Sequence, residues 1–253
     1  MKYIAMIQAR YDSSRLKGKV LLELQGKPVL LHVINRVKKS KYVDETIVLT
    51  SIEKSCLEII ELCAKNKTMV FVGSEEDVLD RYYQAAKLLK PQYIIRITAD
   101  CPLIDWTIID DAIQKMDVNT DYLGMLSETF ADGLDVEIFT YSALETSWKN
   151  AKLNSEREHV TLYIKNHPEL FKLQDYKSSI DGFGELRWTI DEEEDYKLIK
   201  KIYELLYRQG KETFNYKDVL KLMIEEPELM KINKKFKRNE GLAKSLKNDF
   251  LVY

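Results

Sequence analysis

The residues best suited to chemistry form a cationic loop near the amino terminus. The apolar run 3–7 is followed at once by Arg10, Ser13, Arg15 and Lys19. Guanidinium and ammonium groups placed where a buried strand ends bind polyanions, because they neutralise phosphate charge and donate several hydrogen bonds. The loop is therefore expected to hold a nucleoside triphosphate.

Two common phosphate-binding loops are absent from this sequence. No GxGxxG follows the first strand, which excludes a dinucleotide-binding Rossmann loop, and no GxxxxGK is followed by Ser or Thr, which excludes a P-loop. The cradle would instead combine backbone N–H groups around Gly18 with the side chains of Arg10, Arg15 and Lys19. A solvated basic loop is the alternative, but it gives no reason for this cluster to stand at the end of a buried strand.

Two aspartates supply oxygen ligands for a metal ion. Asp100 follows the strand-like segment 93–98, and Asp191 follows another at 186–190. Open α/β sheets place ligands at the carboxyl ends of their strands, so both carboxylates would face the cationic loop from one edge. Such oxygens suit Mg²⁺, which keeps its other positions for water and phosphate. Each aspartate also has a structural alternative: a helix N-cap for Asp191, and a turn before Pro102 for Asp100.

The composition is that of an ordinary globular protein. A chain of 253 residues with 45% hydrophobic side chains can bury one large core. The net charge of −2, from 39 basic and 41 acidic residues, does not indicate binding to nucleic acid or an anionic membrane. Cys56, Cys63 and Cys101 form neither a CxxC pair nor an even disulfide framework, and the chain opens with a strand in place of a signal peptide. We therefore expect a cytoplasmic protein with no membrane span.

Alternating strands and helices must position the loop and the aspartates. Short apolar runs and amphipathic segments alternate through the first half, which is the pattern of βαβ units and a parallel sheet covered by helices. The expected strands are 3–8, 46–50, 69–72 and 93–98, and the expected helices are 28–39, 55–65, 77–89 and 106–116.

The second half departs from this alternation, and we expect a mixed, mainly parallel sheet. Strand-like pieces lie at 135–139, 171–176 and 186–190, and helical segments at 141–150, 156–166 and 192–208. We expect one α/β domain over residues 1–225, followed by a basic extension over 226–253. A solvated helix face or a loosely ordered tail is the favoured interpretation of that extension.

Several motifs together resemble the sugar-acid cytidylyltransferase family, which includes the sialic acid and KDO-activating enzymes. The similarity is closest to the branch named for spore-coat polysaccharide biosynthesis, and it spans roughly residues 3 to 195. It rests on these segments, in the expected order: IQARYDSSRLKGKVL, GKPVLLHVINRV, GSEEDVLDRYYQAAK, RITADCPLID, DGLDVEIF, SEREHVTLYI and LRWTID.

The resemblance implies a fold, a reaction and a set of site residues. Members have a Rossmann-like, glycosyltransferase-A-type nucleotide-diphospho-sugar transferase fold, usually form homodimers, and transfer CMP from CTP to an acceptor with Mg²⁺. Asp100 and Asp191 match the metal-binding aspartates and, with Arg10, Arg15 and Lys19, are the expected catalytic groups. The expected nucleotide site comprises Ala9, Arg10, Ser13, Arg15, Gly18, Lys19, Ser74 and Arg81, and the expected acceptor contacts are Asp132, Asp135, Arg157 and His159.

Two positions differ from the sialic acid and KDO enzymes. Those enzymes carry a glutamine near the position of Thr98, and an acidic residue often follows the metal aspartate where this chain has Cys101. The acceptor is therefore expected to be a sugar acid, another sugar or a polyol-type compound. A glycosyltransferase, a nucleotidyltransferase for another base, or a non-catalytic nucleotide-binding subunit are the alternatives, although the Asp-x-Asp motif that glycosyltransferases usually carry is missing.

Overall fold

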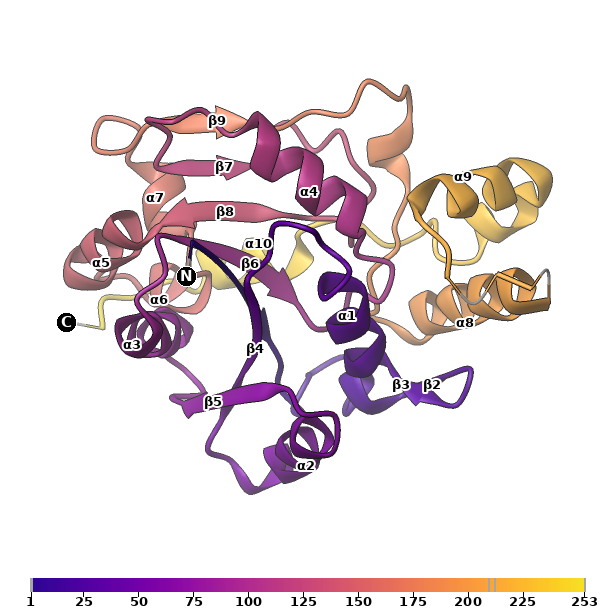
Figure 1. Cartoon of the computed structure of the whole chain (residues 1–253), viewed down its shortest axis with the longest axis horizontal. Helices are drawn as coiled ribbons and strands as arrows, with labels where there is room; N and C mark the ends of the chain where they lie inside the picture. Colours follow the sequence, from indigo (N-terminus) through magenta and orange to yellow (C-terminus); the bar gives the residue numbers. More distant parts are fainter. Residues whose placement is uncertain (1, 209, 212, 253) are drawn as a thin grey trace.

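A seven-stranded mixed sheet forms the centre of the molecule (Figure 1). The computed structural model describes residues 2–208, 210–211 and 213–252. In sequence order the strands are β1 (Tyr3–Gln8), β4 (Glu45–Ser51), β5 (Met69–Gly73), β6 (Tyr93–Thr98), β7 (Tyr122–Gly124), β8 (Glu137–Thr140) and β9 (Leu173–Asp175). Their order across the sheet is β5-β4-β1-β6-β8-β7-β9.

The sheet has a parallel half and a mixed half. β1 pairs in parallel with β4 and with β6, and β4 pairs in parallel with β5. β8 runs antiparallel to both β6 and β7, and β9 is parallel to β7. The expected α/β class with a mixed, mainly parallel sheet is therefore confirmed. β1 and β6 lie side by side, so their carboxyl ends bring the loop after Gln8 next to the turn after Thr98.

Helices cover both faces of the sheet, because the central strands are apolar on both sides. Along β1, Ala5 and Ile7 pack into one apolar cluster while Ile4 and Met6 pack into the other. The first cluster is closed by α1 (Val29–Val37), α2 (Leu57–Lys65), α4 (Trp106–Lys115), α8 (Glu193–Arg208) and α9 (Tyr216–Glu225). The second is closed by α3 (Val78–Leu89), α5 (Tyr141–Asn150) and α7 (Leu162–Asn166), and Figure 1 shows the two helical layers on opposite sides.

Short elements connect these layers. They are the 3-10 helices η1 (Lys19–Leu21), η2 (Lys54–Cys56), η3 (Phe183–Glu185) and η4 (Pro227–Lys231), the hairpin of β2 (Glu23–Leu24) and β3 (Lys27–Pro28), and the helices α6 (Asn154–Glu158) and α10 (Glu240–Lys247). No helix in the part of the chain that the structure describes is long and apolar enough to span a membrane.

Three details of the second half differ from the sequence-based expectation. The segment 186–190 is not a strand, since only Arg187 forms a bridge, to Asp132. The helix expected over 156–166 is two short helices, α6 and α7, interrupted at His159, whose φ and ψ of −102° and 52° leave the helical region. Strand β7 was not expected at all.

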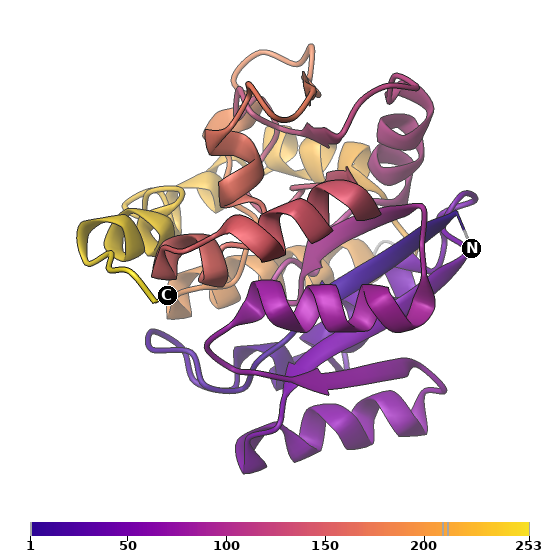
Figure 2. The same ribbon diagram turned by 90° about the vertical axis from the view of Figure 1, so that its left-hand side faces the viewer.

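The chain returns to the sheet edge after η4. Helix α10 packs beside α6, and the last described residues run along the start of α6 (Figure 2). Asn154 N–H donates to Phe250 O at 2.9 Å, and Val252 N–H donates to Lys152 O at 2.8 Å. Residues 237–252, defined here as the C-terminal segment, therefore lie against the body of the molecule.

Candidate active site

A cavity of about 590 Å³ opens at the carboxyl ends of β1 and β6. Its lining residues come from the cationic loop after β1, the turn after β6, the start of α3, and the helices α6 and α10. This cavity is here called the nucleotide cavity. It is lined by the expected nucleotide-binding residues Ala9, Arg10, Ser13, Arg15, Lys19 and Arg81 and by the expected metal ligands Asp100 and Asp191.

Local turn chemistry sets the shape of the loop. Gly18 has a φ of 68°, a left-handed conformation that side chains disfavour, and a Cβ there would lie 3.2 Å from the Tyr11 ring. Gly18 N–H donates to Tyr11 O at 2.9 Å, and Lys19 N–H donates to Leu16 O at 3.3 Å. These two backbone N–H groups are thus used inside the turn. The conformation of Gly18 starts η1 so that the side chain of Lys19 enters the site.

Lys19 joins the two aspartates that were expected to hold a metal. Its Nζ lies 2.5 Å from Asp100 Oδ2 and 2.7 Å from Asp191 Oδ1, and the residue is 7% exposed. Burial raises the pKa of Asp100, but the charge and hydrogen bond of Lys19 outweigh it and hold the pKa at about 2. Burial lowers the pKa of Lys19, and the two carboxylates overcome that effect and raise it. Asp100 is therefore charged beside the cation that it shares with Asp191.

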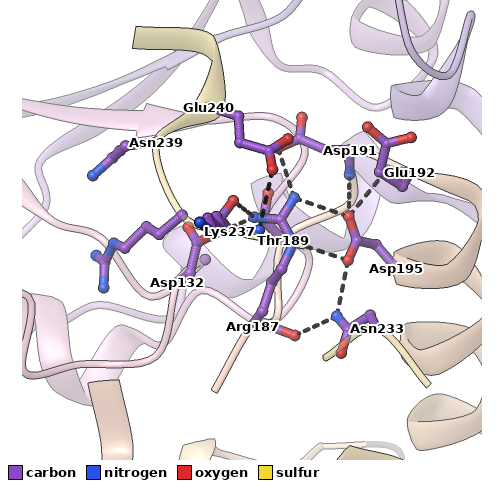
Figure 3. Close-up of polar contacts among 12 residues, drawn as sticks. Asp132, Arg187, Thr189, Asp191, Glu192, Asp195, Asn233, Lys237, Asn239 and Glu240 are labelled. Carbon is purple, nitrogen blue, oxygen red and sulfur yellow. Dashed lines mark hydrogen bonds and ion pairs between the residues drawn. The ribbon is translucent and has the colours of Figure 1, made fainter. Parts of the chain in front are cut away.

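Asp191 is held by two further cations. Arg15 Nη2 lies 2.7 Å from Asp191 Oδ1, and Arg187 Nη2 lies 3.0 Å from Oδ2. Figure 3 shows Arg187 between Asp191, Asp132 and Asp195. Arg187 and Asp195 are both buried and hydrogen-bonded to each other, so the guanidinium of Arg187 holds the Asp191 carboxylate in a fixed position.

Asp195 completes this arrangement. Its Oδ2 accepts the backbone N–H groups of Asp191 and Glu192, each at 3.0 Å, and its Oδ1 accepts Asn233 Nδ2 at 2.8 Å (Figure 3). The acidic first turn of α8 therefore orients the backbone that carries Asp191, an effect stronger than a simple N-cap.

The residues fit a divalent metal ion. An ammonium group already stands between Asp100 and Asp191, which shows that their oxygens converge on one cation position. No group of three or more His, Cys, Asp or Glu side chains within 2–208, 210–211 and 213–252 could hold a metal by itself. A metal here would need further oxygen ligands, which phosphate and water supply.

Arg81 lines the nucleotide cavity and has unused hydrogen-bond donors. It is 2% exposed, and its Nε and Nη1 atoms are buried without a hydrogen-bond partner among the described residues. A Cβ at Gly73 would lie 3.1 Å from Arg81 Cγ, so this glycine leaves room for the arginine. Buried donors without partners cost stability, and a ligand acceptor in the cavity would satisfy them.

A second cavity of about 400 Å³, here called the acceptor cavity, adjoins the first. Both are lined by Arg15, Asp100, Asp191 and His159. The acceptor cavity adds Asp132 and Asp135 from the expected set, together with Arg96, Tyr122, Glu137, Thr161, Lys165, Arg238 and Asn239. Asp100 and Asp191 thus stand where the two cavities meet.

Two charge clusters shape the acceptor cavity. Glu137 accepts hydrogen bonds from Tyr122 Oη at 2.6 Å and Thr161 Oγ1 at 2.7 Å, and it pairs with Arg96 and Lys165. Asp132, in contrast, has its pKa raised to about 7 by burial and then by the charge of Asp135, which together outweigh the nearby arginines. One wall is therefore rich in cations and the other in carboxyl groups.

His159 lies between the cavities as a neutral base. Burial lowers its pKa, the charge of Glu158 opposes this, and nearby cations add to the lowering, so the neutral imidazole is favoured at pH 7. Ser245 Oγ donates its single proton to Glu158 Oε2 at 2.9 Å, so His159 Nε2 is the donor in its 3.0 Å contact with Ser245 Oγ. Nδ1 is then the nitrogen able to accept a proton.

Three expected residues lie outside these two cavities. Gly18 is buried within the turn, and Ser74 lines neighbouring cavities, where its Oγ accepts Asp77 N–H at 3.0 Å. Arg157 pairs with Asp77 and donates to Trp148 O at 2.8 Å, which ties α6 to α3. The structure therefore gives Arg157 a place in helix packing.

Sequence reasoning missed residues that the fold brings to the site from distant segments. The C-terminal segment supplies Glu240, Gly241, Lys244, Ser245 and Asn248 to the nucleotide cavity. Arg187, Arg96 and Lys165 were also missed. Arg187 and Arg96 sit inside apolar runs, where a lone cation signals a buried ion pair, whereas nothing in the sequence singles out α10 from any other basic helix.

Comparison with known proteins gives consistent matches. A model of the cytidylyltransferase family matches residues 4–220. An uncharacterized protein of Methanocaldococcus jannaschii is 39% identical over 239 residues, covering 92% of this chain and 95% of that protein. The spore coat polysaccharide biosynthesis protein SpsF of Bacillus subtilis is 37% identical over 213 residues, covering 79% of this chain and 85% of SpsF.

A solved structure is similar over nearly the whole chain. The structure of a cytidylyltransferase from Leptospira borgpetersenii has a TM-score of 0.86 and 34% identity, and the match covers 94% of this chain and 100% of that one. The region matched by the family model contains Arg10, Asp100 and Asp191 but ends before α10.

Proposed function

The chain belongs to the cytidylyltransferase family, and from this premise we propose that it transfers CMP from CTP to a sugar-acid or related polyol-type acceptor and releases pyrophosphate. Similarity to SpsF supports a role in making precursors of surface polysaccharide or other glycans. The observation that carries the proposal is the cluster of Lys19, Asp100 and Asp191, which stands where the two cavities meet.

The nucleotide cavity suits CTP in one orientation. Arg10, Arg15 and Lys19 would bind the triphosphate, because three cations balance most of its charge. Arg81, which also lines this cavity, would use its free Nε and Nη1 to donate to acceptor atoms of the cytosine or ribose. The α-phosphorus would then lie near Asp100, facing the acceptor cavity.

Substrate binding would exchange ion-pair partners. In the free protein Lys19 pairs with both aspartates, and Arg15 pairs with Asp191. On binding, these cations would turn to phosphate oxygens and release the carboxylates. Asp100 and Asp191 would then hold Mg²⁺, which neutralises phosphate charge and polarises the reacting phosphoryl group.

The transfer itself needs no covalent enzyme intermediate. An acceptor hydroxyl would attack the α-phosphorus in line, its new O–P bond replacing the bond between that phosphorus and the oxygen that bridges to the β-phosphate. Arg15 and Lys19 would stabilise the departing pyrophosphate, and His159, which lines both cavities, would take the hydroxyl proton on Nδ1.

Pyrophosphate release tests this function. CTP, UTP, ATP and GTP are each incubated with a panel of sugar acids, sugars and polyol phosphates, and the mass of any nucleotide-linked product is determined. We expect turnover with CTP, an acceptor-dependent CMP-linked mass, and a loss of at least about 100-fold in Asp191→Asn. Glu193→Gln, on the exposed start of α8, is the matched control. Preference for another nucleotide, or full activity in Asp191→Asn, would refute the proposal.

A further inference from the structure

Helix α10 covers the junction of the two cavities. Glu240 and Gly241 line both of them, Lys244, Ser245 and Asn248 line the nucleotide cavity, and Asn239 lines the acceptor cavity. Figure 3 shows Glu240 beside Asp191 and above Arg187, and Glu240 Oε2 lies 3.7 Å from Arg15 Nη1. The first turn of α10 is thus next to the cationic loop.

Helix α10 turns a polar stripe of side chains toward the body of the protein, where a helix packed for stability turns an apolar one. Positions 240, 241, 244, 245 and 248 follow helical spacing, so they form one stripe, and this stripe faces the cavity. It is polar, whereas Leu246 is 49% exposed and the helix buries no residue. Amphipathic helices normally bury their apolar stripe. A polar stripe turned toward a cavity suits a polar ligand.

Polar contacts hold the C-terminal segment in place, and the half-buried Leu242 is the residue of α10 that adds apolar surface to the acceptor cavity. Arg238 pairs with Asp135, Asn239 Nδ2 donates to Glu128 Oε1 at 2.5 Å, and Ser245 Oγ donates to Glu158 Oε2 at 2.9 Å. Beyond the helix, Asp249 accepts Ser155 N–H at 2.9 Å and Ser155 Oγ at 2.5 Å. Water can replace each of these bonds at a net cost of about 0.5–1.5 kcal/mol, and opening exposes little apolar surface. The helix can therefore separate from the cavities at modest cost.

Lys244 is the cation that α10 adds to the nucleotide cavity. It lies one turn after Glu240 on the same stripe, and therefore within a side chain's reach of the loop that carries Arg15. Glu240 pairs with Arg15 only while no anion competes for that guanidinium. A bound phosphate chain would displace Glu240 from Arg15 and attract Lys244.

We propose that the C-terminal segment is a lid that closes over the phosphate chain of the nucleotide, with Lys244 as its phosphate-binding residue. The proposal rests on the nucleotide site of the proposed function. It adds a binding residue outside the region that the family model matches. A closed α10 would also shield the reacting phosphorus from water and complete the wall of the acceptor cavity through Asn239.

Binding of inorganic tripolyphosphate tests the lid without reference to base or acceptor. Its affinity is measured by calorimetry for the unsubstituted protein and for Lys244→Met, Lys244→Arg and Lys247→Met. Lys247 is exposed on the same helix and lines neither cavity, so it is the matched control. We expect binding about tenfold weaker in Lys244→Met, and affinity near that of the unsubstituted protein in the other two variants.

Hydrogen exchange provides the second readout. Amides of residues 240–248 should exchange rapidly in the free protein and at least several-fold more slowly with tripolyphosphate bound. Equal affinity of Lys244→Met and Lys247→Met, or exchange in α10 that tripolyphosphate leaves unchanged, would overturn the lid. Pyrophosphate release from CTP is measured separately. If the protein releases pyrophosphate normally but fails these two tests, the lid proposal is refuted and the proposed function stands.

Discussion

At the scale of residues, the charged groups of the site are paired with one another in the free protein. Asp191 is contacted by Lys19, Arg15 and Arg187 at 2.7, 2.7 and 3.0 Å, and Asp100 shares Lys19. The ammonium of Lys19 occupies the position between the two carboxylates, so a divalent ion by itself would have to displace it. Metal and nucleotide should therefore bind cooperatively. Phosphate draws the cations away from the carboxylates, and the metal releases the same cations to bind phosphate.

Replacing Lys19 should separate metal binding from catalysis. In Lys19→Met the aspartates lose their shared cation, so Mn²⁺ alone should bind several-fold more tightly, while turnover should fall about 10²–10³-fold because pyrophosphate loses a stabilising charge. Electron paramagnetic resonance of free Mn²⁺, with and without CTP, measures the first effect. Lys17→Met removes an exposed loop lysine that pairs with Asp12, and serves as control. Unchanged Mn²⁺ affinity in Lys19→Met would count against the exchange of partners.

Asp132 should make stability depend on pH. Its pKa is raised to about 7 in the folded protein, from 3.8 for the free group, so the folded state holds the proton more tightly. Stability from this group is full below pH 4 and is lost as pH rises toward 7. Relative to Asp132→Asn, the unsubstituted protein should lose on the order of 2 kcal/mol between pH 5 and 8. Urea unfolding across that range measures this difference.

The exposed Asp181 provides the control for that titration. Asp181→Asn should leave the pH dependence of unfolding as it is in the unsubstituted protein. A stability difference between Asp132→Asn and the unsubstituted protein that is constant from pH 5 to 8 would show that Asp132 does not titrate in this range.

At the scale of elements, one glycine holds two active-site segments together. Gly133 has a φ of 101°, and a Cβ there would lie 2.6 Å from Thr189 N and from Trp188 C. The close approach allows the single bridge between Asp132 and Arg187, which aligns the two segments that carry Asp132 and Asp191.

Substituting Gly133 should therefore be costly. Gly133→Ala combines an unfavourable φ with a clash against backbone atoms, and should lower the free energy of unfolding by about 3 kcal/mol or more. Gly26→Ala has a similar positive φ of 73° but no atom within 4 Å, and should cost only about 1 kcal/mol. Thermal unfolding measures both variants. Gly26→Ala reports the backbone strain alone, and Gly133→Ala reports the backbone strain together with the clash. Equal losses would show that the close approach does not matter.

The spacing of apolar residues predicted most helices and strands, and it failed where the backbone leaves helical or strand geometry. The strands and helices of the first half were predicted to within a few residues. The alternation in 186–190 correctly signals burial, since Trp188 and Ile190 are buried, but a strand also needs a continuous hydrogen-bonding neighbour, which sequence does not reveal. The break at His159 was equally hidden, because apolar spacing continues through it.

At the scale of the whole molecule, the family, the fold class and the centre of the site were predictable. The cytidylyltransferase resemblance is confirmed by the family match, and Arg15, Lys19, Asp100 and Asp191 do converge at one sheet edge. They were predictable because strand ends in a parallel sheet share an edge. The homodimer and the identity of the acceptor stay predictions.

The contribution of the C-terminal segment was not predictable from local patterns. Its helix is polar, short and basic, a pattern typical of a solvated extension, and none of its residues is buried. Its position over both cavities depends on tertiary contacts such as Ser155 with Asp249, about which local patterns carry no information.

A crystal structure of the protein with CTP and Mn²⁺ tests the central claim most directly. The account predicts an anomalous peak touching both Asp100 and Asp191, with the phosphates on Arg10, Arg15 and Lys19 and the base toward Arg81. Nucleotide bound elsewhere, or Lys19 still joining the two aspartates while CTP and metal are present, would contradict it.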